Sequence, residues 1–204
     1  MRSKLLSSIA GALAIVLAGV PAFAQCTIDG MITAAENAVD PDLGDWRYVL
    51  EVTWDTGSPT ALSHLGLVVD IPGGNCDCAE IASAIAFAYP GGSSDGEPDG
   101  CLVDYEGFVE CNGDPSIPID GILLKWEPLM MEDGCEPGPL GTGWFVFYSD
   151  YPPVPVDDSI PILAEKNDGD FCAGLIGGVF PSLPCNPVPT EGTSWSDLKA
   201  LYRH

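Results

Sequence analysis

The chain has 204 residues, and its 30 acidic and seven basic residues give a formal charge of −23. So negative a surface repels phosphate backbones and anionic lipid headgroups, which excludes nucleic acid as a partner class. The length accommodates one domain once the two ends of the chain are set aside.

The first 24 residues have the pattern of a cleavable secretory signal peptide. Arg2 and Lys4 precede an apolar run at 5–20, and Ala22-Phe23-Ala24 supplies the small residues of a cleavage site. The run is shorter than the roughly 20 residues that span a bilayer, so we expect no membrane span in the mature chain. Cleavage would leave five basic residues against 30 acidic ones. We expect a secreted, periplasmic or cell-surface protein.

All eight cysteines follow the signal peptide, and an even number in an exported chain predicts structural disulfides. Proximity in the sequence suggests Cys101 with Cys111 and Cys172 with Cys185, although full connectivity is not deducible. The disulfide candidates are Cys26, Cys76, Cys78, Cys101, Cys111, Cys135, Cys172 and Cys185.

Cys76 and Cys78 are separated by one residue, so we expect them to bond to different partners. Paired CxxC spacing and nearby histidines are missing, which favours disulfides over metal ligation. A lipid-modified Cys26 is an alternative that the sequence leaves open, although Gln25 precedes it.

Short apolar segments separated by Gly, Pro, Asp and Asn clusters predict a mainly β protein. At 46–54 alternate residues are apolar, which places them on one face of a strand. Residues 79–89 fit a helix and a strand equally well. Further strands are expected at 64–71, 122–126, 144–148, 160–164 and 171–180.

Nineteen prolines and 24 glycines punctuate these strands, and no strand alternates with a long amphipathic helix. This pattern favours a disulfide-stabilised antiparallel β-sandwich, Ig-like or jelly-roll-like, at 25–185. Large irregular loops are expected at 91–118 and 127–142.

The end of the chain predicts a different structure. Residues 186–193 form a Pro-rich linker, and 194–204 a short amphipathic helix. Ser194 and Asp197 are spaced as a capping box at its start. A helix this short is marginal alone in water, so we expect the tail to dock on its own domain or on a partner.

Candidate catalytic residues are few. The segment Gly92 to Gly96 matches G-x-S-x-G, but a polar loop is expected to follow it, whereas a nucleophile elbow leads into a helix. His64 starts a strand and is expected to be a half-buried structural residue bonded to backbone. We therefore predict no catalytic residue and no enzyme activity. A secreted hydrolase is the weakest alternative, and the observation that would favour it is a Ser or carboxylate within hydrogen-bond reach of His64 in a cleft.

Two acidic turns are candidate calcium ligands, Asp40 to Asp45 and Asn167 to Asp170. Neither matches the twelve-residue EF-hand loop, and ordinary Asx and Asp-Gly turns explain both. We predict no metal site and no cofactor, with calcium kept as an alternative.

Several segments, in order, resemble a family of uncharacterised exported bacterial β-sandwich domains. They include the strand Leu62-Ser63-His64, the Gly-Ile-Lys-Phe-like strand at 121–127 and the Gly-Pro-Ser-Cys-like element at 177–185, and the others are at 48–53, 145–147 and 162–166. The tail at 194–203 is similar to a tail found on other secreted bacterial proteins. The extra cysteines and long acidic loops depart from the family pattern. The resemblance implies export and a β fold, and leaves function open.

These observations predict a non-enzymatic structural or adhesion module of the cell envelope or medium, whose partner is an extracellular protein or glycan. The alternative is a carbohydrate- or calcium-dependent binding domain. Aromatic side chains can stack on sugars, and Trp144, Tyr148 and Tyr151 are the candidates.

Overall fold

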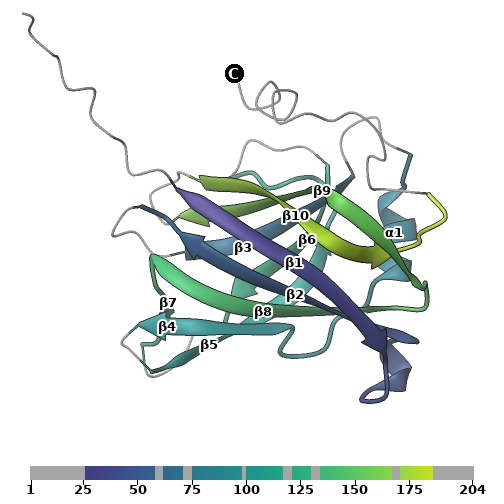
Figure 1. Cartoon of the computed structure of the whole chain (residues 1–204), viewed down its shortest axis with the longest axis horizontal. Coiled ribbons are helices and arrows are strands. Elements are labelled where there is room, and N and C mark those ends of the chain that lie inside the picture. The colour runs from purple at the N-terminus through teal and green to yellow at the C-terminus, as the bar shows by residue number, and fades with distance from the viewer. Residues whose placement is uncertain are drawn as a thin grey trace, which may run out of the picture.

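The computed structural model describes residues 26–57, 62–70, 75–97, 100–116, 121–129, 134–166 and 171–185 (Figure 1). The predicted signal peptide at 1–24, the linker at 186–193 and the tail helix at 194–204 lie outside these residues.

The described chain is built almost entirely of strands. A short 3₁₀ helix follows the first strand, and one α-helix follows the third. The elements are β1 (Thr27–Glu36), η1 (Pro41–Leu43), β2 (Trp46–Asp55), β3 (Leu62–Asp70), α1 (Cys78–Ala84), β4 (Gly92–Glu97), β5 (Leu102–Glu110), β6 (Ile122–Pro128), β7 (Glu136–Pro137), β8 (Leu140–Ser149), β9 (Pro153–Lys166) and β10 (Phe171–Pro181).

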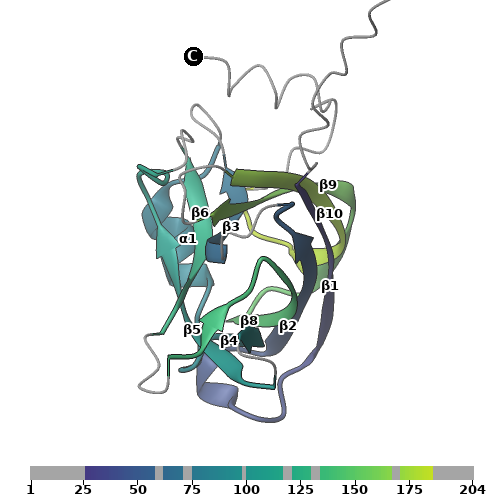
Figure 2. The same cartoon turned by 90° about the vertical axis from the view of Figure 1, so that its left-hand side faces the viewer.

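The strands pair into one continuous ten-stranded sheet, in the order β5-β6-β3-β9-β10-β1-β2-β8-β4-β7. Only β1 and β10 run parallel among the described pairs. The sheet curls until β4, which pairs with β8, also pairs with β5 and closes the ring. Figure 2 shows the strands encircling a common interior, with α1 outside the ring. Closure leaves the nine ring strands with a neighbour on each side, which removes exposed edges.

The prediction of a mainly β, disulfide-stabilised fold is confirmed. Two separate packed sheets are not confirmed, because the backbone pairing runs around one curled sheet without a break. The segment responsible is β4, whose sequence GSSDGE lacks the apolar alternation that marks a strand.

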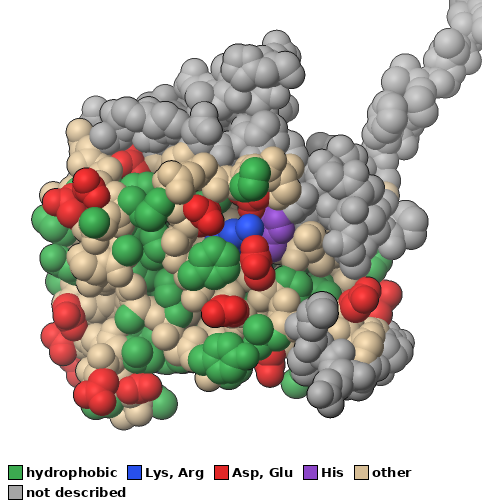
Figure 3. Space-filling model, turned by 180° about the vertical axis from the view of Figure 1, so that it is seen from behind, with side chains coloured by type: hydrophobic (Ala, Val, Ile, Leu, Met, Phe, Trp, Pro, Cys, Tyr) green, Lys and Arg blue, Asp and Glu red, His purple; other side chains and the backbone are tan. Residues whose placement is uncertain are grey.

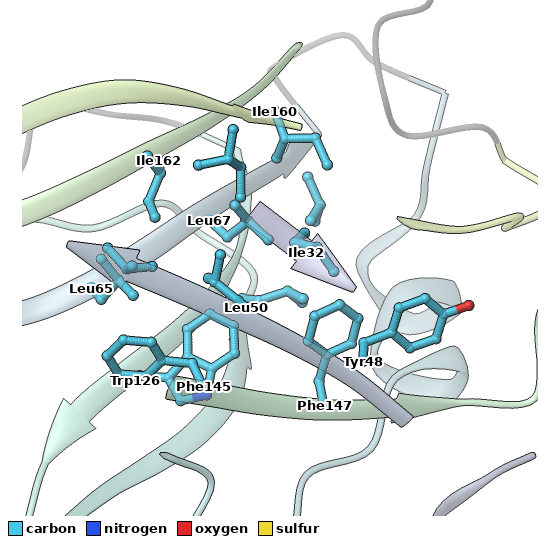
Figure 4. Close-up of a cluster of buried hydrophobic side chains, with 14 of the residues drawn as sticks. Ile32, Tyr48, Leu50, Leu65, Leu67, Trp126, Phe145, Phe147, Ile160 and Ile162 are labelled. Atoms are coloured by element: carbon cyan, nitrogen blue, oxygen red, sulfur yellow. The ribbon is translucent and has the colours of Figure 1, made fainter. Parts of the chain in front are cut away.

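The interior of the ring is filled by large apolar side chains (Figure 4). In β2, Tyr48, Leu50, Val52 and Trp54 are buried, which confirms the face predicted by alternation. Figure 4 shows Tyr48 and Leu50 of β2 meeting side chains from distant strands. They include Ile32, Leu65, Leu67, Trp126, Phe145, Phe147, Ile160 and Ile162.

The prediction of large irregular loops at 91–118 and 127–142 is wrong in part, since β4, β5, β7 and the start of β8 lie there. Close approach of the backbone explains β4. A Cβ added at Gly92 would lie 2.8 Å from the Phe145 ring, and one at Gly96 would lie 2.6 Å from Cys135 Sγ. Small residues at these positions therefore mark tight strand packing.

The segment at 79–89, which fits a helix and a strand equally well by sequence, contains helical residues followed by a residue in a β-bridge. The helix α1 begins after Asp77, which forms a reciprocal capping box with Glu80. It ends at Ala84, and Ala86 then forms a β-bridge with Tyr148.

All eight cysteines are paired, which agrees with the prediction of four disulfides. The pairs Cys101–Cys111 and Cys172–Cys185 suggested by proximity are wrong, because the closed sheet brings distant segments together. The distinct partners expected for Cys76 and Cys78 are confirmed. The bonds are Cys26–Cys172, Cys76–Cys185, Cys78–Cys111 and Cys101–Cys135.

Bonding of Cys26 to Cys172 leaves Cys26 without a free thiol for a lipid. Four disulfides indicate a protein that folds outside the reducing cytosol.

Candidate functional site

The outer face of β1, β2, β8, β4 and β5 carries a row of side chains in direct register. Met31, Glu51, Trp144, Ser93 and Asp104 are successive partners across these five strands. Directly opposed residues on neighbouring strands point to the same side of a sheet. The residues beside them in β2 and β8 point into the core (Figure 4), so this row faces outward. We call it the Trp144 row.

Trp144 differs from the other tryptophans of the ring in its exposure. Trp144 is 41% exposed, whereas Trp46 is half-buried and Trp54 and Trp126 are 2% and 0% exposed. The buried indoles donate to carbonyl oxygens, Trp54 to Gly138 and Trp126 to Gly91. Trp144 therefore offers part of an indole ring to a ligand from the middle of a rigid sheet.

Hydroxyl groups accompany the indole on the same face. Ser93 lies directly opposite Trp144 on β4, and Thr53 and Thr142 form the neighbouring pair on β2 and β8. An aromatic surface flanked by hydroxyls and the Glu51 carboxylate supplies both the stacking and the hydrogen-bonding groups that a sugar ring uses.

The other two predicted aromatic candidates are less available. Tyr148 is 5% exposed, and its backbone N–H and C=O groups both form hydrogen bonds with Ala86. Tyr151 is half-buried, and its carbonyl accepts a 2.7 Å hydrogen bond from the Tyr48 hydroxyl. Of the three candidates, the structure leaves Trp144 as the one suited to contact a ligand.

A second polar feature is a buried cluster of four ionisable residues, His64, Asp114, Lys125 and Glu127, which we call the Asp114 cluster. His64 Nε2 lies 2.6 Å from Asp114 Oδ2, and Lys125 Nζ lies 3.0 Å from the same oxygen. Lys125 Nζ also lies 2.7 Å from Glu127 Oε1. The Asp114 side chain is 2% exposed and that of Glu127 is 50% exposed, so one end of the cluster reaches solvent.

Figure 3 shows the histidine beside a basic side chain on the face opposite the Trp144 row, with carboxylates around them. The segment that carries Asp114 is held locally as well. The Cys78–Cys111 bond precedes it, and Asp114 Oδ1 accepts hydrogen bonds from the backbone and hydroxyl of Ser116. The cluster thus fixes the loop after β5 onto β3 and β6.

The charges of the cluster shift the pKa values of its members. Burial by itself raises the pKa of Asp114, but hydrogen bonds from Ser116 and Lys125 and the nearby His64 outweigh burial and lower it from 3.8 to about 2. Burial lowers the pKa of Lys125, and its contacts with Glu127 and Asp114 outweigh burial and raise it. Both groups are therefore held in their charged forms.

The lowered pKa of Asp114 makes stability depend on acidity. The unfolded chain takes up the proton more readily, so the contribution of Asp114 is present above about pH 4 and is lost as the pH falls toward 2. We expect the difference in urea midpoint between wild type and Asp114→Asn to shrink across this window. Because both proteins share the remaining carboxylates, parallel curves down to pH 2 would contradict this role.

The serine of the G-x-S-x-G match is not placed for catalysis. Ser94 is fully buried in β4, and its hydroxyl lies 2.9 Å from the Tyr105 hydroxyl. Burial raises the pKa of Tyr105 to about 12, against the opposing effect of Ser94. Two strands, β5 and β6, separate β4 from the strand of His64. The structure brings His64 to Asp114 instead, a partner that the sequence did not reveal.

The first predicted calcium turn is a 3₁₀ turn held by Asn37. The Asn37 amide donates to the carbonyl oxygens of Asp40 and Gly44. The second, at 167–170, lies outside the described residues. Within the described ranges, no group of three or more His, Cys, Asp and Glu side chains is arranged to hold a metal ion.

A hollow of about 160 Å³ lies between α1 and the end of the described chain, lined by residues that include Ile81, Tyr151 and Leu183. Ligand pockets are usually about 300–1,000 Å³, so this hollow is small for a ligand of that size.

The chain matches no protein-family model and no curated protein. The resemblance to exported bacterial domains therefore stays a prediction. No helix in the described part of the chain is long and apolar enough to cross a membrane.

Proposed function

We propose that the protein is an exported, non-enzymatic adhesion module that binds a carbohydrate on the outer face of β1, β2, β8, β4 and β5. The supporting observation is the Trp144 row, which presents a 41% exposed indole at the centre of a strand-supported face. Sugar rings expose apolar C–H faces that stack on indoles, and their hydroxyls bond to flanking polar groups. An open face accommodates a polymer chain that passes over it.

Rigidity of the face supports a binding role further. The backbone of Trp144 is paired with Glu51 on one side and with Ser93 on the other. The ligand therefore does not need to order the backbone here, so little backbone conformational entropy is lost on binding. The four disulfides suit the same role, because they preserve the fold outside the cell.

Replacing Trp144 with alanine is expected to lower the affinity for the bound glycan at least about tenfold, because aromatic anchors carry a large share of binding energy. Leu140→Ala is the matched control, since Leu140 lies on the same strand and is 70% exposed. A glycan array probed with the three proteins, in calcium and in EDTA, measures the effect.

We expect binding in both buffers, because the Trp144 row requires no metal. A glycan signal that Trp144→Ala leaves intact would refute the proposed face. Signal in calcium alone would favour the calcium-dependent alternative.

A further inference from the structure

The charges around Trp144 define the ligand more narrowly. Glu51 is opposite Trp144 on β2, and Asp95 and Asp104 lie beyond it on β4 and β5. Glu51 and Asp95 are exposed and Asp104 is half-buried. None of the three forms an ion pair with another described residue.

Compensating basic side chains are scarce among the described residues of this face. Of the seven basic residues in the chain, the structure describes the side chains of Arg47 and Lys125. Lys125 is held by Asp114 and Glu127 in the cluster on the opposite face. Arg47 lies four residues from Glu51 along β2, so their Cα atoms are about 13 Å apart at the rise of a strand. Among the described side chains, Glu51 and Asp104 in the Trp144 row and Asp95 beside it are therefore carboxylates without an ion-pair partner.

A negative face disfavours glycans that carry uronate or sulfate groups and attracts those that carry a positive charge. An indole also attracts cations through the electron-rich face of its ring. An amino sugar satisfies both features, because its ring stacks on Trp144 while its ammonium group approaches Glu51 or Asp95. We propose that the preferred ligand is a cationic amino-sugar polymer with free amines. This inference rests on the proposed carbohydrate-binding function.

The test uses two probes with the same sugar backbone, a β-1,4-linked glucosamine hexamer and the same hexamer fully N-acetylated, in which each ammonium group is replaced by an uncharged acetamide. Titration calorimetry on the full mature chain at low salt is expected to give about tenfold tighter binding of the free-amine hexamer. Glu51→Gln should reduce this ratio, as should raised salt, because both weaken exposed charge interactions. Glu36→Gln is the control, since Glu36 is an exposed carboxylate at the far end of β1.

The outcomes separate the two proposals. Equal affinities for the two hexamers, lost in Trp144→Ala, would overturn the preference for a cation and keep the carbohydrate function. A ratio that survives Glu51→Gln and raised salt would also overturn the charge argument. Binding of either hexamer that survives Trp144→Ala would overturn the proposed face itself, as would absence of binding to both hexamers and to all array glycans.

Discussion

Replacing Asp114 with alanine is expected to lower the free energy of unfolding by about 3–5 kcal/mol, since it removes the centre of a buried charge cluster. The change leaves Lys125 with Glu127 as its remaining carboxylate in the cluster, and removes the carboxylate that His64 Nε2 contacts at 2.6 Å. It also removes the acceptor of the Ser116 hydrogen bonds, which frees the loop after β5. Urea denaturation with the disulfides intact measures the loss.

Glu127→Gln is the matched control for this variant. Glu127 contacts the same Lys125, but its side chain is 50% exposed, so its removal should cost less than about 1 kcal/mol. Asp114→Asn should fall between the two, because an amide keeps the shape and an acceptor for Ser116 while it loses the charge. Equal losses for Asp114→Ala and Glu127→Gln would show that burial of the cluster does not determine its energetic role.

Complete reduction of the disulfides is the second change with a large expected effect, namely cooperative unfolding at ambient temperature. Each native disulfide typically contributes about 2–5 kcal/mol, and a domain has about 5–15 kcal/mol of total stability. The bridges also join distant segments, with sequence separations of 146 for Cys26–Cys172 and 109 for Cys76–Cys185. Near-ultraviolet circular dichroism with and without reductant follows the loss of packed aromatics.

Alkylation and mass spectrometry provide the control, because eight modified thiols establish that reduction was complete. Peptide mapping of the unreduced protein should recover Cys101 linked to Cys135, and Cys172 linked to Cys26. A fully alkylated protein that keeps its native aromatic spectrum would contradict the structural role of the bridges.

The mainly β class and the core face of β2 followed from the sequence, since alternation at 46–54 depends only on which residues are apolar. Closure of the sheet did not follow from the sequence. It depends on β4, which contains Gly, Ser, Asp and Glu and forms a strand through its pairing with β5 and β8. The long β1, which pairs with β10 in parallel, was also not predicted. Its contacts join the two ends of the domain, and such non-local pairing leaves little local pattern.

Of the five residues in the Trp144 row, the sequence predicts one as a ligand contact. Trp144 was named as a sugar-stacking aromatic, and alternation already placed Glu51 opposite the core face of β2. The other members depend on strand register. Ser93 on β4 is paired with Trp144, and Asp104 on β5 is paired with Ser93. Asp114 escaped prediction for a similar reason. It lies 50 residues from His64 in the sequence, and a lone acid before a proline has no distinguishing signal.

The most direct test of the central claim, that a carbohydrate binds over Trp144, is a titration of the indole N–H signals in a ¹H–¹⁵N spectrum. The Trp144 signal, assigned by its loss in Trp144→Phe, is expected to shift as the free-amine glucosamine hexamer is added. The signals of Trp54 and Trp126 should stay in place, because these buried indoles donate to Gly138 and Gly91 inside the ring. Saturable binding with an unmoved Trp144 signal would contradict the account.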